Sequence, residues 1–435
     1  MTTLILPKQK GIIVPQRIVL PWEIYGIRQA PQPTPVDVYH AAWETARALA
    51  YDLDRYDNWG EFEHKFCDRI HTLDDAVQFA NEAYATLDDP YTRFLGPKKA
   101  QQQADERQGT LTGIGVVFEA KADGDGNIII GRVLEDGPAH NAGIKPGDAL
   151  KKVGRFLVKN MPREKMIERI TGEAGTKVKL TIVRDGEELN FEVTRGIINI
   201  PAVRPERVGE NGKVLYLKFS TFMQDDTVDE MRQSLEENSD AEAIVIGVRF
   251  NPGGQVLQCL RVLSLFIEEG VLVKIRQRIP YKGFQTTVYR LTKERLVVER
   301  TVEATGQTFS QEMPRDPYLA GTKPVVVLTD KWSASASEML AGALKDNGRA
   351  TLIGKTTYGK GIGQTPQPLL DGTVAIVTSL RYFSPNGHWA GDAHKEKIGI
   401  APHIEVDLPE GVMPGSPEDA QLNRALEVIE DQLKG

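Results

Sequence analysis

The second half of the chain contains short, continuous apolar runs that alternate with helical stretches. The runs are VLYLKF, AIVIGVRF and PVVVLT, and residues 256–267 and 338–345 have helical periodicity. Such runs are typical of strands buried on both faces, and their alternation with helices indicates crossover connections. The sequence therefore predicts an α/β core over residues 197–435, closed by a last helix at 418–433.

The first half of the chain has two different patterns. Helix-start signals at Thr34-Pro35 and Thr72 precede apolar residues at helical spacing, of which the first set is Val36, Tyr39, Trp43, Ala46, Leu49 and Leu53. From about residue 113 to residue 194, strand-like runs are separated by Gly-rich turns, which suits one small β-rich domain with two short helices. We therefore predict a multidomain α+β fold, with a helical N-terminal region at 1–105, a β-rich domain at 106–196 and the α/β core.

Composition argues against several functional classes. A net charge of −7 over 435 residues, without a basic cluster among aromatic residues, argues against a nucleic-acid surface. The two cysteines, Cys67 and Cys259, are far apart, so we expect buried apolar side chains rather than a disulfide framework or a zinc knuckle. The seven histidines show no H-x-x-x-H spacing, and the Gly-rich turns lack P-loop and dinucleotide spacing. No metal and no cofactor are predicted.

The N-terminal stretch, MTTLILPKQKGIIVPQRIVLPWE, is interrupted by Pro7, Lys8, Lys10, Pro15 and Arg17. It lacks the continuous apolar segment of a signal peptide, and no later stretch approaches the length of a membrane span. The sequence as written predicts a cytoplasmic protein without a transmembrane segment, although a trimmed leader would leave the same sequence.

The stretch KWSASASEMLAG, residues 331–342, has two physical interpretations. Ser335 and Glu338 fit the capping box S-x-x-E, in which each side chain satisfies an unpaired amide at a helix start. A serine at a helix N-terminus is also well placed for acyl transfer, because the following amide and the helix dipole favour a negatively charged oxygen. The stretch alone leaves both interpretations open.

Three loops that follow apolar runs could border one cleft, since ligands bind at the carboxyl ends of strands in open α/β sheets. They are residues 251–254, the serine stretch, and KTTYGKGIGQ, which holds Lys360 between two glycines. Nothing marks His388, His394 or His403 as a base, but a lysine whose pKa is lowered by burial can act as one. Lys360 is therefore either a general base or a solvated loop residue.

Several blocks of the sequence together resemble a known family. They are DDPYTRFLGP (88–97), GIGVVFE, GPAHNAGIKPGDALKKVG, VLYLKFSTF, RFNPGG, SASASEMLAGALKDNGRATLIGKTTYGKGIGQ, RYFSPNGHW and IGIAPHIEV, in this order. This order and the long serine–lysine block resemble the carboxyl-terminal processing peptidases, which are Ser-Lys serine proteases of the tail-specific type with an embedded PDZ domain. The resemblance covers most of the chain and implies that residues 106–196 are the PDZ domain and residues 197–435 the protease core.

The resemblance implies a catalytic role for three residues. Ser335, the middle serine of SASAS, matches the family's nucleophile, and Lys360, 25 residues later, matches its base. Gln364 matches a residue that orients the lysine through its amide. Ser333 and Ser337 keep a structural interpretation. The implied activity is that of a serine endopeptidase with a Ser-Lys dyad and an acyl-enzyme intermediate.

The resemblance also implies two binding functions. The oxyanion hole would be formed by the amides of Ala336 and of Gly253 or Gly254. The C-terminal carboxylate of a substrate would be bound by β-augmentation at the PDZ loop, which consists of Gly113, Ile114, Gly115 and Val116. We expect polypeptide substrates with free, small or apolar C-termini, and homo-oligomer formation stays open. Family members usually act outside the cytoplasm, so the resemblance and the sequence as written favour different compartments.

Two features depart from the family pattern. Ile170-Thr171-Gly172 stands where the family often has I-R-G-P, which favours a PDZ domain that tethers substrate over one that gates the active site. The segment 271–318 is longer than usual and is predicted to form an extended β-hairpin near the cleft. The alternative function is a non-catalytic ligand-binding or PDZ scaffold protein on the same core, against which the presence of Ser335, Lys360 and Gln364 argues.

Overall fold

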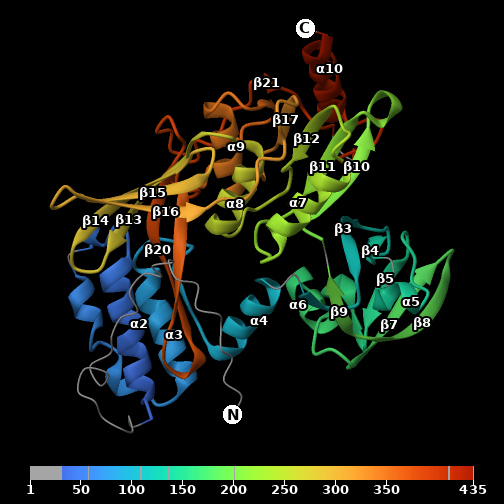
Figure 1. Ribbon diagram of the computed structural model, residues 1–435. Coiled ribbons are helices and arrows are strands. Elements are labelled where there is room, and N and C mark those ends of the chain that lie inside the picture. Colours follow the sequence, from blue (N-terminus) through green and yellow to red (C-terminus); the bar gives the residue numbers. More distant parts are fainter. Residues whose placement is uncertain are drawn as a thin grey trace. The chain divides into compact units, whose positions relative to one another are not determined.

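The computed structural model describes most of the chain (Figure 1), namely residues 32–56, 58–107, 110–134, 137–199, 201–409 and 412–434. The predictions for the N-terminal leader fall on residues that lie outside this description. The chain forms two compact units, of which the first contains residues 1–102, 203–223 and 227–435, and the second contains residues 103–202 and 224–226. The helical region and the α/β core thus belong to one unit.

Two capped helices begin the described part of the first unit. α2 (Pro35–Leu49) and α3 (Leu73–Ala85) each start with a capping box. In the first box, the Asp37 carboxylate accepts from the Thr34 amide at 2.8 Å, and the Thr34 hydroxyl accepts from the Asp37 amide at 3.2 Å. Short 3-10 turns occupy much of the segment between the helices, namely η1 (Leu53–Arg55), η2 (Trp59–Phe62) and η3 (Cys67–Arg69).

The two helices share a hydrophobic core with a strand of the α/β region. Their apolar faces pack against β20 (Val374–Phe383), in a core that includes Tyr39, Trp43, Phe79, Tyr84, Ala375 and Val377. β1 (Arg93–Leu95) pairs with the same strand in antiparallel register, and α4 (Pro97–Arg107) follows. The helical region is therefore a layer on a sheet of the core, which its own sequence could not reveal because the partner strand lies far along the chain.

A six-stranded sheet forms the centre of the α/β core. In spatial order its strands are β10 (Val203–Val208), β11 (Val214–Phe219), β12 (Ala243–Gly247), β17 (Val325–Thr329), β18 (Thr351–Gly354) and β21 (Ile404–Glu405). β10 is antiparallel to β11, and the other neighbours are parallel. Between these strands in sequence lie α7 (Thr227–Glu237), α8 (Val256–Phe266) and α9 (Ala336–Asp346). The predicted α/β core and multidomain α+β fold are confirmed.

The last helix, α10 (Ala420–Lys434), begins two residues later than predicted. Asp419 is fully buried before it, and its carboxylate accepts from the Leu422 amide at 3.1 Å and the Gly415 amide at 2.7 Å. The same carboxylate pairs with Arg249 at 2.7 Å. Asp419 thus holds the helix start, and the sequence could not show its ion pair because Arg249 lies 170 residues away.

A second sheet contains the segment 271–318, which was predicted as one long hairpin. The structure instead has a meander of β13 (Gly270–Ile279), β14 (Gly283–Leu291), β15 (Arg295–Val302) and β16 (Gln307–Pro314). Two of the connecting turns contain Gly283 at φ 77° and Gly306 at φ 68°, where a side chain would be strained. β20 pairs with β13, and β19 (Ile362–Pro368) pairs with β20, which attaches the end of the lysine loop to this sheet.

The second unit is a small β-rich domain. Its main sheet has the order β3 (Val116–Ala122), β4 (Ile128–Val133), β5 (Ala149–Val153), β7 (Lys177–Arg184) and β8 (Glu187–Thr194), with β6 (Phe156–Leu157) beside β5. Its helices are α5 (Pro138–Asn141) and α6 (Arg163–Ile170), and β2 (Thr110–Gly113) pairs with β9 (Gly196–Asn199).

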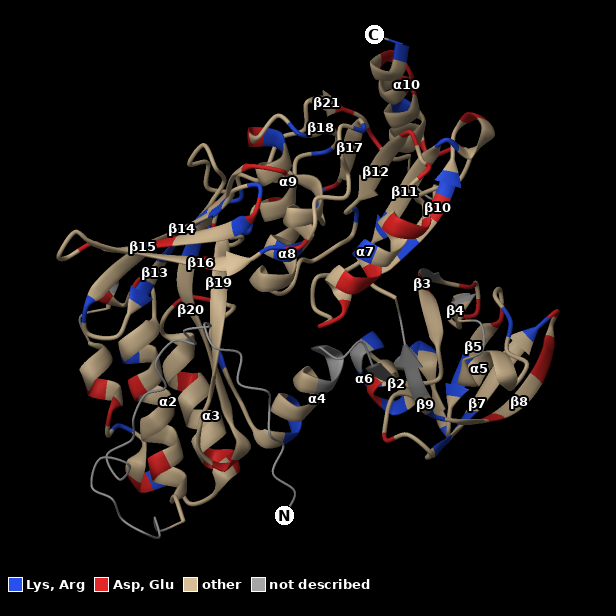
Figure 2. Ribbon diagram, in the orientation of Figure 1, with Lys and Arg blue, Asp and Glu red and all other residues tan. Residues whose placement is uncertain are grey.

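Acidic and basic residues are interspersed along both units (Figure 2). In the second unit, for example, Lys177 of β7 pairs with Glu192 of β8 at 2.7 Å. Within the described ranges, no helix has both the length and the apolar character that a membrane span requires.

Candidate active site

Ser335 lies immediately before α9, in a backbone conformation unusual for a residue with a side chain. β17 ends at Thr329, and the turn that follows leads into the helix at Ala336. Ser335 has φ 56° and ψ −114°, a region that favours glycine and costs a residue on the order of 1–3 kcal/mol. Such strain persists only where neighbouring contacts hold the backbone, so the contacts of this turn must stabilise the conformation of Ser335.

Glu338 supplies the first of these contacts. Its carboxylate is almost fully buried and accepts from the amides of Ser335 at 2.8 Å, Gly359 at 2.7 Å and Lys360 at 2.8 Å, and from the Thr357 hydroxyl at 2.6 Å. Burial raises the pKa of Glu338, whereas these hydrogen bonds lower it. The sequence predicts Glu338 only as a helix cap, but its carboxylate also joins the serine loop to the lysine loop.

Tyr382 on β20 supplies a second contact between the same loops. Its hydroxyl lies 2.9 Å from the Ser335 carbonyl oxygen and also donates to the Lys360 carbonyl oxygen. Burial raises the pKa of Tyr382 well above its usual value, so the phenol stays protonated as a donor. Glu338 therefore accepts hydrogen bonds from the backbone amides of Ser335 and Lys360, and the Tyr382 hydroxyl lies at the carbonyl oxygens of the same two residues.

The side chain of Lys360 is partly buried next to residues of the helical region. Its Nζ lies 4.1 Å from the centre of the Tyr91 ring. Burial lowers the pKa of Lys360 most, and the nearby Arg93 lowers it further, while Asp89 and Glu338 act in the opposite direction. The net lowering of the lysine pKa is what a general base requires, because only the neutral amine accepts a proton.

The Gln364 side chain is hydrogen-bonded to a residue other than the lysine. It lies on β19, and its Nε2 donates to Thr378 Oγ1 at 2.9 Å. Within the described part of the chain, no hydrogen bond joins Gln364 to Lys360. The register of β19 against β20 shifts between Gly363 and Gln364, which turns the side chain toward Thr378.

The glycine loop, residues 251–254, packs closely against Ser335. A Cβ atom at Gly253 would lie 2.7 Å from the Ala336 nitrogen and 2.8 Å from Ser335 Cβ, so only glycine fits there. The Gly253 amide is already engaged, since it donates to Asn251 Oδ1 at 2.9 Å. The amides of Gly254 and Ala336 donate to none of the residues that the structure describes. Of the two glycines considered from the sequence, Gly254 therefore has the available amide.

Asp330 and two serines join the glycine loop to the serine loop. The Asp330 carboxylate accepts from the Phe250 amide at 3.1 Å and from the Ser333 amide at 2.8 Å. Ser333 donates to the Val248 carbonyl at 2.8 Å, and Ser337 donates to the Asn251 carbonyl at 3.0 Å. Both of these serines are fully buried and use their hydroxyls in structural hydrogen bonds.

The proposed carboxylate loop lies in the second unit and is held through its carbonyl oxygens. The Ile114 carbonyl accepts from the Ala139 amide at 2.7 Å, and the Gly115 carbonyl accepts from the Leu134 amide at 2.9 Å. The amides of Ile114 and Gly115 have no acceptor among the described residues. Gly115 has φ 78°, which a side chain would oppose. The Ile114 side chain is buried in the core of this unit, and Val116 packs against that core.

The exposed edge strand next to this loop has an unexpected contact. β3 is the terminal strand of its sheet, where an added peptide strand would pair. Arg163, at the start of α6, donates to the carbonyl oxygens of Phe118 at 2.9 Å and Glu119 at 2.7 Å on β3. The β-bulge recorded at Phe118 allows two successive carbonyls to face one guanidinium.

Four residues of this arrangement were not singled out from the sequence. Glu338 was treated as a cap, and Tyr91, Arg93 and Tyr382 were given no role. Tyr91 and Arg93 lie in DDPYTRFLGP, which was used only as a family resemblance, so its two side chains near the base could have been named from that block. No local pattern marks Tyr382, which is one apolar residue in a buried strand.

Comparison with known proteins identifies the family. Residues 213–406 match peptidase family S41, and residues 102–183 match the PDZ domain. The chain is 32% identical over 327 residues to carboxy-terminal processing protease CtpA of Bacillus subtilis, an alignment that covers 75% of this chain and 62% of that protein. It therefore spans less than two thirds of the length of that relative.

Two further similar proteins are aligned over more of their own length. The chain is 30% identical over 402 residues to the carboxyl-terminal-processing protease of Picosynechococcus sp., with 90% of this chain and 89% of that protein aligned. The solved structure of the photosystem II D1 C-terminal processing protease matches with a TM-score of 0.54 and 25% identity, over 87% of this chain and 95% of its own. These findings confirm the resemblance seen in the sequence. The chain belongs to the carboxyl-terminal processing proteases of peptidase family S41, and it carries a PDZ domain.

Proposed function

We propose that this protein is a serine endopeptidase in which Ser335 is the nucleophile and Lys360 its general base. The observation that carries the proposal is the pair of contacts, from Glu338 and Tyr382, that hold the backbone of both residues together. The lowered pKa of Lys360 and the unused amides beside Ser335 supply the two other requirements, a proton acceptor and an oxyanion hole.

The reaction follows from these positions. The Ser335 hydroxyl attacks the scissile carbonyl while its proton passes to the neutral Lys360 amine, and the amides of Gly254 and Ala336 donate to the carbonyl oxygen as it becomes negative. The lysine then returns the proton to the departing amine, which leaves an ester on Ser335. A water molecule, deprotonated by the same lysine, attacks the ester carbonyl. The lysine then gives this proton to the departing Ser335 oxygen, which releases the new C-terminus and restores the hydroxyl. Gln364 would orient the lysine after leaving Thr378.

The PDZ domain, proposed at residues 106–196, would select substrates by their C-terminus. The amides of Ile114 and Gly115 are available for a carboxylate, and β3 offers an edge for the last residues of the substrate. Apolar side chains near Val116 favour a small or apolar final residue. We therefore propose polypeptides with free C-termini as substrates, cleaved upstream of the bound end.

A single experiment separates the protease from a binding protein on the same fold. A poorly folded test protein that ends in a free, small apolar residue is incubated with the wild-type chain and with Ser335→Ala, and products and protein adducts are followed by mass spectrometry. Cleavage by the wild type alone, with a transient acyl mass on the peptide that contains Ser335, supports the proposal. Cleavage at equal rates by both proteins contradicts it, and tight binding without cleavage by either favours the non-catalytic alternative.

A further inference from the structure

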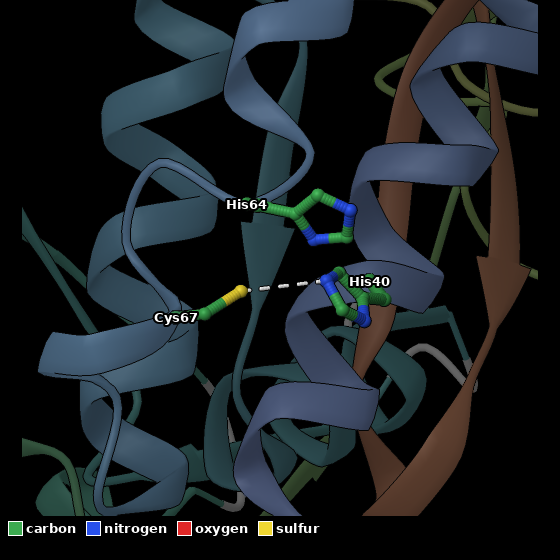
Figure 3. A group of neighbouring side chains, drawn as sticks. All are labelled: His40, His64 and Cys67. Carbon is green, nitrogen blue, oxygen red and sulfur yellow. Dashed lines mark hydrogen bonds between the residues drawn. The ribbon is translucent and has the colours of Figure 1, made fainter.

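Two histidines and a cysteine of the helical region lie together and share no residue with the catalytic arrangement (Figure 3). His40 lies on α2, whereas His64 and Cys67 belong to the segment of 3-10 turns. The Cys67 sulfur is 3.4 Å from His40 Nε2, and the three side chains offer ligand atoms that all lie within 4.8 Å of one another. The rings of His40 and His64 meet edge to face, with centroids 5.3 Å apart.

These separations suit a tetrahedral transition-metal ion. With Zn–S bonds near 2.3 Å and Zn–N bonds near 2.0–2.1 Å, neighbouring ligand atoms are about 3.3–3.6 Å apart. The sulfur and His40 Nε2 already have this separation, and the other ligand atoms need to move by only about 1 Å. Mixed thiolate and imidazole ligands are those that zinc prefers.

A tetrahedral ion at these three side chains needs a fourth ligand. Glu63 Oε1 lies 4.0 Å from His64 Nε2, and the Glu63 carbonyl oxygen lies 3.8 Å from the Cys67 sulfur. A water molecule can complete four-coordination, because the His64 side chain is largely exposed and the site is open to solvent.

We propose that His40, His64 and Cys67 bind a divalent transition-metal ion, with zinc as the preferred metal, and that the ion fastens the 3-10 segment to α2. On binding, the Cys67 thiol loses its proton to solvent and the sulfur bonds to the metal as thiolate. The crosslink joins residues that are distant in sequence across a stretch that has neither a long helix nor a strand of its own. The site is structural, since the serine and lysine chemistry uses none of these groups.

This proposal revises the expectation of no metal. That expectation rested on the lack of histidine pairs one helical turn apart, but His64 and Cys67 have the equivalent spacing H-x-x-C. The third ligand comes from a different helix and could not be found by spacing. A thiol–imidazole hydrogen bond is a simpler explanation for the contact between Cys67 and His40. It does not explain why the exposed His64 ring lies beside these two side chains.

Cobalt(II) titration of the full chain tests the site, because cobalt replaces zinc and a thiolate–cobalt bond gives an intense near-ultraviolet band. We expect one equivalent to bind with this band and with the visible bands of tetrahedral cobalt. Cys67→Ser should abolish the near-ultraviolet band, and His64→Asn should weaken binding at least tenfold. His71→Asn, which changes an exposed histidine shortly after the site, is the matched control and should bind like wild type.

Thermal unfolding gives a second readout that does not depend on colour. Stoichiometric zinc should raise the Tm of the wild type and of His71→Asn, and should leave the Tm of His64→Asn nearly unchanged. His64 is exposed, so this variant keeps the test valid even if Cys67→Ser folds poorly. Peptidase activity measured with and without zinc should be the same. A near-ultraviolet band that persists in Cys67→Ser, or equal zinc effects on all variants, would overturn the proposal.

Discussion

The loops around Ser335 and the loop at residues 113–116 both present unused backbone amides, but the protein holds them differently. Around Ser335, buried side chains hold the backbone. Glu338 accepts hydrogen bonds from three amides, and the Tyr382 hydroxyl contacts two carbonyl oxygens. In the PDZ loop, among the residues that the structure describes, the carbonyl oxygens of Ile114 and Gly115 accept from the main-chain amides of Ala139 and Leu134.

The difference fits the role that we propose for each loop, an oxyanion hole at Ser335 and a carboxylate site at residues 113–116. A developing oxyanion is stabilised only if its donors are already in place, since donors that must reorganise during the reaction lose most of their effect. The C-terminal carboxylate of a substrate is already charged before it binds, so its binding free energy can offset the cost of small rearrangements of a loop. We therefore expect substitutions around Ser335 to act on kcat and substitutions around the PDZ loop to act on KM.

The largest expected effect concerns the two reacting groups. Ser335→Ala and Lys360→Ala should each reduce kcat at least about 10³-fold, because one removes the proposed nucleophile and the other its proposed base. Lys360→Arg should fail as well, since a guanidinium cannot be deprotonated in proteins. Steady-state kinetics on a tail-bearing substrate, with circular dichroism to show that each variant is folded, checks this. A Lys360→Ala protein with near-normal kcat would refute the assignment of the base.

Glu338 should have the next largest effect. Glu338→Ala leaves three amides and one hydroxyl without their acceptor in a buried site, so both loops should shift, and kcat should fall about 10²-fold because of the misplaced nucleophile. Glu338→Gln, which keeps the shape and one acceptor oxygen, should lose less. The comparison is made by single-turnover kinetics and thermal unfolding.

Glu242 provides a control for Glu338. It forms an exposed ion pair with Lys213 at 3.0 Å, and exposed pairs contribute little to stability. Glu242→Ala should leave both kcat and Tm unchanged. If Glu338→Ala behaved like Glu242→Ala, the idea that buried side chains preorganise the catalytic loops would be wrong.

The pH dependence of kcat/KM reports the environment of Lys360. Because burial and Arg93 both disfavour the ammonium, the pKa of Lys360 lies below the ordinary lysine value, and activity should rise with pH through a midpoint below that value. Arg93→Gln removes a neighbouring positive charge, so the pKa should rise and the whole profile should move to higher pH. A shift of roughly one unit means an approximately tenfold loss near neutral pH and none above the new midpoint.

Arg424→Gln serves as the control for Arg93→Gln, since Arg424 is a surface residue of α10 that pairs with Glu427. Its pH profile should match that of the wild type. A profile that is flat from pH 5 to pH 9 in the wild-type protein, or a shift to lower pH in Arg93→Gln, contradicts the lysine-base mechanism.

How much of this could be predicted depends on the distance over which a residue acts. The strands β11, β12 and β17 and the capping boxes of α2 and α3 were predictable, because their signals lie within a few residues of one another. The resemblance to a family pointed to Ser335 and Lys360 as catalytic candidates. The hydrogen bonds from the Glu338 carboxylate to the lysine loop were not predictable, since they join residues 19–22 positions apart through tertiary packing.

The same reason explains the failures elsewhere in the first unit. Tyr382 resembles any apolar strand residue in the sequence, and its hydrogen bonds to two carbonyl oxygens depend on tertiary packing. The ion pair of Asp419 with Arg249 likewise joins residues 170 positions apart. The error at 271–318 has a local cause instead: Gly283 and Gly306 mark two chain reversals within the segment, so a meander rather than a single hairpin could have been predicted. Only this last error could have been avoided from the sequence.

Substrate choice should show a smaller effect, confined to KM. A test protein with a small or apolar free C-terminus should have a KM about tenfold lower than the same protein ending in Asp or Lys, or amidated, because the PDZ loop amides then bind a carboxylate beside apolar side chains. Deletion of residues 106–196 should remove this preference and leave kcat on short peptides nearly unchanged. An equal loss of activity on tail-bearing and tail-less substrates would contradict tethering and favour gating.

The smallest effect, and the one that most sharpens the comparison, is expected at Arg163. Its guanidinium donates to the Phe118 and Glu119 carbonyls of the edge strand, so a substrate tail that pairs with β3 has to compete with it. Arg163→Ala should therefore strengthen tail binding by about two- to fivefold, the amount that one exposed hydrogen-bonded contact commonly contributes, with kcat unchanged. Arg155→Ala, at an exposed arginine of the same unit, is the control. Calorimetry with a peptide of the substrate tail measures the change, and weaker binding in Arg163→Ala would show instead that the arginine is part of the peptide site.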